Sequence, residues 1–242
     1  MNIAPQTLFS IAGFPFTNTV FVTLIVDVII VFIVVSAARA LSVRPGKFQN
    51  AVEAVVDYFY SATKDIAGDR ASFIYPWVLS FFIFIVIANL IEFIPGFESI
   101  RLIPHDSAAA AAAGMEERGI PLFRVATSDL NLTLALAVIS VIMSHYYSIK
   151  YTGIKAYIGR FVSFKMFGFF LIVGAIELMS ELVKFITFSF RLFGNIFAGD
   201  VALAVTKYFF VMASFEIFVG VIQAFVFATL TMAFTTMLTE KH

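Results

Sequence analysis

Charge is the scarcest property of this chain. Asp, Glu, Lys and Arg make up 13% of its 242 residues and hydrophobic residues make up 61%, whereas an ordinary soluble domain carries about 25% charged residues. The formal net charge is zero, which argues against nucleic acid as a partner. Cysteine is absent, which excludes disulfides, thiolate nucleophiles and cysteine metal sites. The first residues contain no basic segment, so we expect no cleaved signal peptide.

Long apolar runs make up most of the chain. A helix needs about 20 mostly apolar residues to cross a bilayer, and five segments meet this length: residues 18–41, 71–94, 130–149, 161–205 and 208–238. As one helix, residues 161–205 would extend roughly 68 Å, too far for a single perpendicular crossing. We therefore predict an all-α integral membrane protein, a single membrane domain over residues 1–242. Its last two helices are expected to be long, strongly tilted and paired as a hairpin.

Charge is concentrated in the segments between these runs. Residues 45–68 combine apolar positions at helical spacing with charged side chains, which predicts an amphipathic helix in the membrane interface. Lys and Arg gather in residues 39–70 and 150–165, and cytoplasmic loops carry such an excess. We therefore expect both segments in the cytoplasm, and the loop of residues 97–128 outside.

Arg191 is the most informative polar residue, because its surroundings are almost entirely apolar. A charge at membrane depth costs roughly 2.5 to 3.5 kcal/mol on insertion scales, so it is kept where it faces protein or water. Glu177 and Lys184 precede it at intervals of seven residues, which places the three within about 40° of one line along a helix. Ser180 and Asn195 fall near the same line. The pattern predicts a polar stripe on an apolar helix.

Other polar residues extend this stripe to a second helix. Asp200 lies about 13 Å along the axis from Arg191 on nearly the opposite side, and Glu216 and Gln223 share one face of the last helix. If the two helices are antiparallel, Gln223 approaches Arg191 and Glu216 approaches Asp200. The predicted order is two acids near the outside, an arginine in the middle, and Glu177 toward the cytoplasm.

Structural interpretations of these residues stay open. Polar groups can pair merely to hold helices together, since interhelical polar bonds in membranes average about 0.6 kcal/mol. Lys184 can extend its ammonium group along its aliphatic stem to the interface. His105 and His145 are isolated in the sequence and show no metal-ligand spacing, so we expect neither a metal site nor a cofactor.

Three motifs connect these residues to a known family. They are TSDLN at Thr127–Asn131, SFRLFGNIFAGD at Ser189–Asp200 and IQAFVFATL at Ile222–Leu230. In their sequence, order and separation they resemble subunit a of the F-type ATP synthase, the membrane stator that faces the rotating c-ring. The resemblance covers nearly the whole chain, and RLFGN followed by QAF in a protein with five spans is highly specific.

The resemblance implies a role for most of the polar residues. Arg191 corresponds to the essential arginine, Asn195 to its neighbour in the motif, and Gln223 to the glutamine that faces it. Glu177 corresponds to the acid of the cytoplasmic half-channel, with Ser180 on the same path. Asp200 and Glu216 occupy the outer half-channel positions, where the family commonly has Glu or His. Lys184 and Asp129 are further candidates.

The resemblance also implies a mechanism and partners. Each c subunit carries one mid-membrane carboxylate, which faces lipid only when protonated, because an ionised carboxylate in hydrocarbon is prohibitively costly. The partners expected are the c-ring, the peripheral-stalk b subunits, the rest of the complex, the lipid bilayer and protons. The subunit itself is expected to be non-catalytic. We expect a bacterial plasma membrane, with the mitochondrial inner membrane or the thylakoid as the alternative.

Two other functions remain as alternatives. A secondary transporter would use Glu177, Arg191 and Asp200 as a substrate site, but transporters usually have repeated halves and broken helices, which this sequence does not show. A purely structural membrane scaffold would have no ion path. Co-purification with a ring of small hairpin proteins and a soluble ATPase head would favour the stator.

Overall fold

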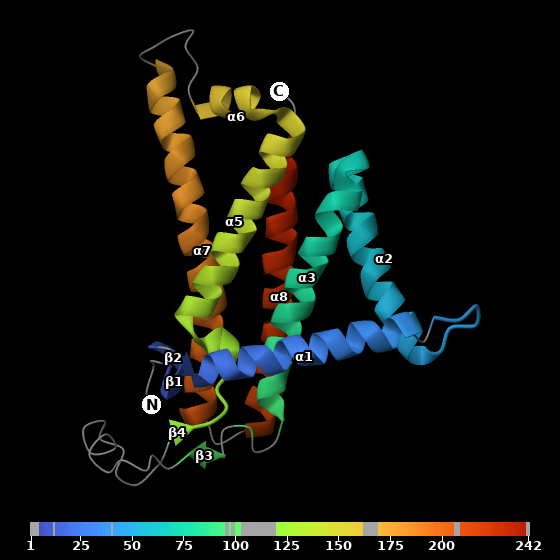
Figure 1. Ribbon diagram of the computed structural model, residues 1–242, viewed down its shortest axis with the longest axis vertical. Coiled ribbons are helices and arrows are strands. Elements are labelled where there is room, and N and C mark those ends of the chain that lie inside the picture. Colours follow the sequence, from blue (N-terminus) through green and yellow to red (C-terminus); the bar gives the residue numbers. More distant parts are fainter. Residues whose placement is uncertain are drawn as a thin grey trace.

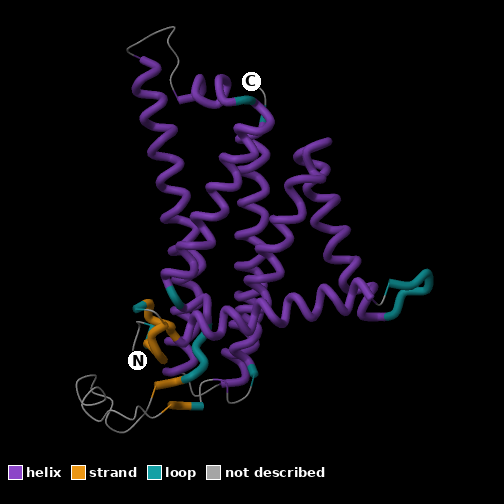
Figure 2. Tube along the Cα trace, viewed as in Figure 1, coloured by secondary structure: helices purple, strands orange, loops and turns teal. Residues whose placement is uncertain are grey.

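The computed structural model describes residues 5–11, 13–39, 41–94, 97, 100–102, 120–161, 169–205 and 209–240. Helices dominate, and the strands form only small antiparallel pairs (Figure 2): β1 (Thr7–Ile11) with β2 (Phe14–Thr17), and β3 (Arg101–Leu102) with β4 (Ile120–Pro121). Five described segments are long and apolar enough to cross a membrane: Asn18–Arg39, Lys47–Phe93, Leu130–Thr152, Met179–Gly199 and Val211–Thr239. The prediction of an all-α integral membrane protein is confirmed.

Four helices form the central bundle (Figure 1): α3 (Ala71–Leu90), α5 (Leu130–Thr152), α7 (Phe169–Val205) and α8 (Phe209–Thr239). α8 contacts each of the other three. One buried cluster draws side chains from all four helices, among them Ile85, Leu136, Leu192 and Phe227. α7 and α8 are long and antiparallel, as predicted for the last two helices.

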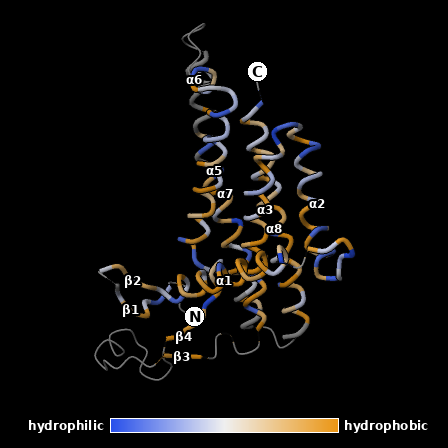
Figure 3. The backbone as a smooth tube through the Cα atoms, turned by 45° about the vertical axis from the view of Figure 1, so that its right-hand side comes forward, coloured by the Kyte–Doolittle hydropathy of each residue, from blue (hydrophilic) through white to orange (hydrophobic). Residues whose placement is uncertain are grey.

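α2 (Lys47–Ala67) lies beside α3 and is joined to it by the short helix η1 (Gly68–Arg70) (Figure 1). Gly68 has a φ of 59°, a conformation that favours glycine at this sharp turn. Phe59, Thr63 and Ala67 are buried against α3 and α8, so the apolar side of the amphipathic pattern packs against protein. Figure 3 shows hydrophilic colours at the α2–α3 turn and hydrophobic colours along the bundle. Placement of α2 in a membrane interface stays a prediction.

α1 (Asn18–Arg39) runs across the other helices (Figure 1), although its length and apolarity suit a membrane span. The sequence predicts this segment as one of five membrane spans. It is apolar on all sides, so its sequence specifies no single packing face. At its start Asn18 donates a hydrogen bond to the carbonyl of Pro121 (3.1 Å) and Thr19 donates one to Asp129 (2.8 Å). Val22 and Val26 are then buried in a cluster that includes Ala88 of α3.

A short helix precedes the long helix expected over residues 161–205. Gly153 has a φ of 84° and ends α5. A separate short helix, α6 (Ile154–Phe161), then lies across the ends of α5 and α7 (Figure 1). Residues 162–168 lie outside the described residues, as does most of the loop predicted over 97–128, and the described α7 begins at Phe169.

Candidate functional site

Arg191 lies on the outer side of α7. Ser189 is fully buried, and its hydroxyl lies 3.2 Å from that of Thr133 on α5, within hydrogen-bond distance. Leu192 packs into the core, whereas Phe190 and Arg191 are exposed. Anchoring the inner residues therefore turns the guanidinium outward. Among the described residues no acid pairs with Arg191, so its charge is accessible to a partner.

The contacts between α7 and α8 determine which polar residues lie at the same height along the two helices. One buried cluster joins the two helices through Phe188, Leu192, Ala224 and Phe227. The helices are antiparallel, so Gln223, which adjoins Ala224, lies at the level of Arg191, which adjoins Leu192. Asn195, one helical turn after Arg191, is partly buried, as is Gln223. This register agrees with the one inferred from the sequence.

Glu216 is a buried acid on α8, only 7% exposed. Its carboxylate packs directly against Gly199 of α7, where an added methyl group would overlap it. Gly199 precedes Asp200, so Glu216 meets α7 beside the acid that the sequence predicts as its neighbour. Gly199 lies roughly 12 Å along the helix from Arg191. The side chains of Asp200 and Glu177 lie outside the described part of the structure.

A second group of polar side chains lies near the other end of α7. Glu181 is 6% exposed. One of its oxygens, Oε1, accepts a hydrogen bond from Nζ of Lys184 at 2.6 Å, and the other, Oε2, lies 3.5 Å from Nε2 of His145 on α5. The opposite ring nitrogen, Nδ1, lies 3.1 Å from the hydroxyl of Tyr157 on α6. The Lys184 ammonium also lies 4.5 Å from the ring centre of Phe234 on α8.

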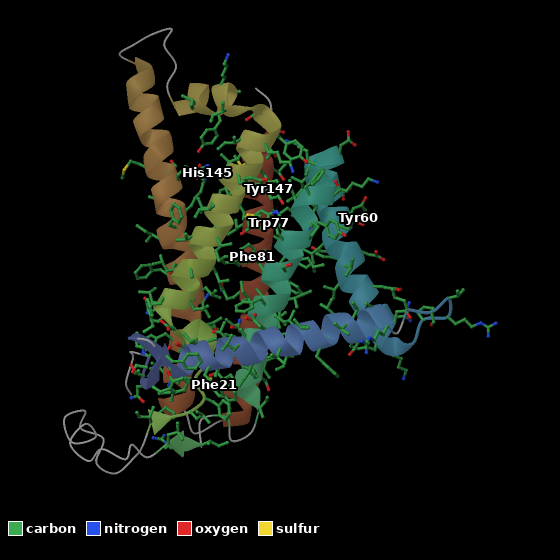
Figure 4. All side chains as sticks on the ribbon, in the orientation of Figure 1. Phe21, Tyr60, Trp77, Phe81, His145 and Tyr147 are labelled. Atoms are coloured by element: carbon green, nitrogen blue, oxygen red, sulfur yellow. The ribbon has the colours of Figure 1, made fainter. Side chains whose placement is uncertain are left out.

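Sequence reasoning missed this group, which we call the Glu181–His145 cluster. Figure 4 shows His145 between α5 and α7, below α6. Glu181 falls about 80° around the helix from Arg191, off the predicted stripe, and His145 is isolated in its own segment. The only local signal is the three-residue spacing of Glu181 and Lys184, which places them on neighbouring turns of one face. Nothing local connects either residue to α5 or α6.

Two other predicted site residues have local partners. The Ser180 hydroxyl is exposed and donates to the carbonyl of Ile176 at 2.9 Å. Asp129 is 6% exposed and caps the start of α5, accepting the backbone N–H of Asn131 at 2.9 Å and the hydroxyl of Thr19 at 2.8 Å. These contacts are those of a helix cap, and a role for Asp129 in proton transfer stays a prediction.

Hydroxyl contacts hold α5 against α8 and so support the α7–α8 pair that carries the site. They recur at four-residue intervals along α5: Ser140 Oγ with Thr231 Oγ1 (2.9 Å), Ser144 Oγ with Thr235 Oγ1 (2.8 Å), and Ser148 Oγ with the Leu238 carbonyl (2.6 Å). Small side chains allow helices to approach closely in membranes. We call these contacts the hydroxyl row.

Comparison with known proteins adds a further finding. Residues 20–236 match the family described as ATP synthase A chain, and this range contains all three motifs quoted above. ATP synthase subunit a of Alteromonas mediterranea is 32% identical over 219 residues, which cover 85% of this chain and 77% of that protein.

Proposed function

Because this chain belongs to the ATP synthase A chain family, we propose that it is the stator subunit that conducts protons past the c-ring of an F-type ATP synthase. Family membership makes it a membrane-embedded subunit of the ATP synthase, which acts in ATP synthesis and proton transport. We further propose that it is non-catalytic, contacts the c-ring and the peripheral-stalk b subunits, and lies in a bacterial inner membrane, as its bacterial relative favours.

The observation that carries this proposal is an exposed arginine on an apolar helix face. Large apolar side chains are exposed along the same helix: Ile176, Met179, Val183, Ile186 and Phe190. A guanidinium cannot be deprotonated in a protein, so Arg191 holds a permanent charge there. A c-ring carboxylate that passes it is favoured in its ionised form, because a nearby positive charge lowers the pKa of a carboxyl group.

The acids on either side of Arg191 supply and remove the proton in this mechanism. A proton enters from outside through Glu216 and Asp200 and neutralises a c-ring carboxylate, which then rotates into lipid. After nearly a full turn, the carboxylate releases the proton toward Glu177 and the cytoplasm, and Gln223 and Asn195 supply polar contacts at the level of Arg191. Arg191 prevents direct leakage between the two half-channels. One charge crossing 100 mV releases about 2.3 kcal/mol, so several protons are needed per ATP.

Substitution of Arg191 tests the proposal. Arg191→Ala is expected to abolish ATP synthesis and ATP-driven proton pumping, since nothing then favours release of the proton from the carboxylate. Arg191→Lys is expected to fail as well, because an ammonium group lacks the planar fork of arginine and loses its proton more readily when buried. Both rates are measured in inverted membrane vesicles.

Assembly is the control for both variants. Each complex is purified in mild detergent, and the amounts of c-ring and soluble ATPase head that co-purify are expected to match the parent, because Arg191 points out of the bundle. Parent rates of synthesis in either variant would overturn the proposed function. Loss of assembly with unchanged flux per remaining complex would show that Arg191 only stabilises the packing of the helices.

A further inference from the structure

The Glu181–His145 cluster lies outside the set of residues that the proposed function uses. We infer that its buried carboxylate and imidazole exchange the transported proton with the cytoplasm, an inference that rests on the proposed function. Its Glu181 lies on α7 roughly 15 Å along the helix from Arg191. It is on the opposite side of Arg191 from Gly199 and Glu216, in the half of α7 predicted to be cytoplasmic.

The charges of the cluster fit a site that holds one exchangeable proton. Burial of a lone carboxylate is costly, but each oxygen of Glu181 has a basic group beside it. Lys184 balances the carboxylate charge and has the face of Phe234 next to its ammonium, a favourable position for a cation. The charges of Glu181 and Lys184 cancel, so a proton on His145 gives the cluster one net positive charge. Imidazole is the side chain whose ordinary pKa lies closest to neutral.

The cluster also has a route toward the end of the bundle. His145 links two elements, since Nε2 faces Glu181 and Nδ1 faces the Tyr157 hydroxyl of α6. α6 lies across the end of the bundle (Figure 1), and its Ile154 and Ile158 are exposed. The titratable or charged side chains described around Glu181 thus come from α5, α6 and α7, while α8 contributes an aromatic ring.

The proposed transfer conserves protons at each step. Protonated Glu181 gives its proton to Nε2 of His145, which leaves a carboxylate beside an imidazolium. The imidazolium then releases its Nδ1 proton to water past the Tyr157 hydroxyl, which leaves a neutral imidazole with its proton on Nε2. Loss of one proton from Nε2 and gain of one at Nδ1 return His145 to the tautomer that can again accept a proton from Glu181. One proton arrives and one leaves, and Lys184 keeps its charge throughout.

Proton pumping by the intact complex in inverted vesicles tests this transfer, because the outer medium then bathes the cytoplasmic face. His145→Gln and Glu181→Gln are each expected to lower flux per assembled complex by roughly tenfold, less than the hundredfold or more of many positioned proton donors, since water still reaches the half-channel. The double variant is expected to be no slower than either single one, because both groups serve one step.

Two further readouts separate a proton relay from a helix brace. The pH profile of pumping by His145→Gln is expected to differ from that of the parent complex, and imidazole in the medium is expected to restore part of the flux of His145→Gly. Tyr157→Phe is expected to slow pumping, whereas Tyr146→Phe, an exposed neighbour of His145 on α5, is the matched control and keeps the parent rate.

The Arg191 variants distinguish failure of this inference from failure of the proposed function. If Arg191→Ala abolishes pumping but the cluster variants keep the parent flux and pH profile per assembled complex, only the inference is wrong. The same holds if the cluster variants lose assembled complex while each remaining complex pumps normally. If Arg191→Ala pumps normally, the proposed function is itself wrong.

Discussion

At the scale of single residues, the absence of a side chain at Gly199 decides where an acid can lie. The Glu216 carboxylate occupies the space that a methyl group on Gly199 would fill. Glu216 can therefore approach α7 closely beside Asp200 while remaining buried. A buried acid at a helix–helix contact in a membrane is costly, and such residues mark ion pathways more often than simple packing contacts.

Gly199→Ala is expected to displace Glu216 and slow proton entry. The overlap forces either the acid or the α7–α8 contact to shift, which costs about 1 to 3 kcal/mol for an overpacked site. We expect lower proton flux per assembled complex, and partial recovery in Gly199→Ala combined with Glu216→Asp, because the shorter acid leaves room for the methyl group.

Gly159→Ala provides the control, because a methyl group at Gly159 meets no atom within 4 Å. It is expected to retain the parent flux. Parent flux in Gly199→Ala, with no loss of complex, would show that the position of Glu216 does not limit proton entry.

At the scale of helices, the hydroxyl row fixes α5 against α8. Its three contacts recur once per turn along both helices, so a shift by one residue would break all of them together. Each interhelical polar bond contributes only about 0.6 kcal/mol on average in membranes. The row therefore specifies the register of the helices more than it stabilises them.

Substitutions at Ser144 separate these two effects. Ser144→Ala is expected to lower the free energy of unfolding by about 0.6 kcal/mol, a small change in thermal unfolding in detergent. Ser144→Leu is expected to cost about 1 to 3 kcal/mol, because a large side chain forces α5 away from α8.

Ala135→Leu, at an exposed position of α5, controls for the added volume and is expected to unfold at the parent temperature. Equal effects of Ser144→Ala and Ser144→Leu would contradict close packing at this contact.

At the scale of the whole molecule, charge and packing indicate the same polarity for the bundle. The α2–α3 turn lies toward the same end as the C-terminus of α8, and Arg70 at that turn donates a hydrogen bond to Thr239 at 3.0 Å. α6 lies at this end too (Figure 1). Lys64, Arg70, Lys150 and Lys155 belong to the segments that meet there, which favours a cytoplasmic location. Arg39, Arg44 and Lys47, expected on the same side, lie instead at the connection between α1 and α2, at the opposite end of α2 (Figure 1).

Cysteine labelling tests this polarity, and the native chain contains no cysteine to interfere. Cysteines that replace the exposed residues Asp69 and Ile154 are expected to react only with reagents added to the cytoplasmic side. A cysteine in place of Ile100, which is also exposed, is expected to react only from outside. Reaction of the Ile100 variant from the cytoplasm would reverse the sides of the membrane assigned to the two half-channels.

The sequence by itself determined the properties that depend on neighbours along one helix. Apolar runs identified the helices of the bundle, because a bilayer requires a minimum length of apolar helix. A spacing of seven residues placed Arg191, Lys184 and Glu177 on one line, because the α-helix has a fixed period. The level of Gln223 opposite Arg191 followed only on the condition that the last two helices are antiparallel.

Only the tertiary structure decided which residues from different helices meet. His145 and Glu181 show no common spacing, and they are brought together by the packing of α5 against α7. The fit of Glu216 against Gly199 depends on side-chain volumes across an interface, and no local pattern records it. The crosswise direction of α1 depends on contacts with distant residues, namely the hydrogen bonds of Asn18 and Thr19 and the packing of Val22 and Val26, because an evenly apolar helix has no preferred face of its own.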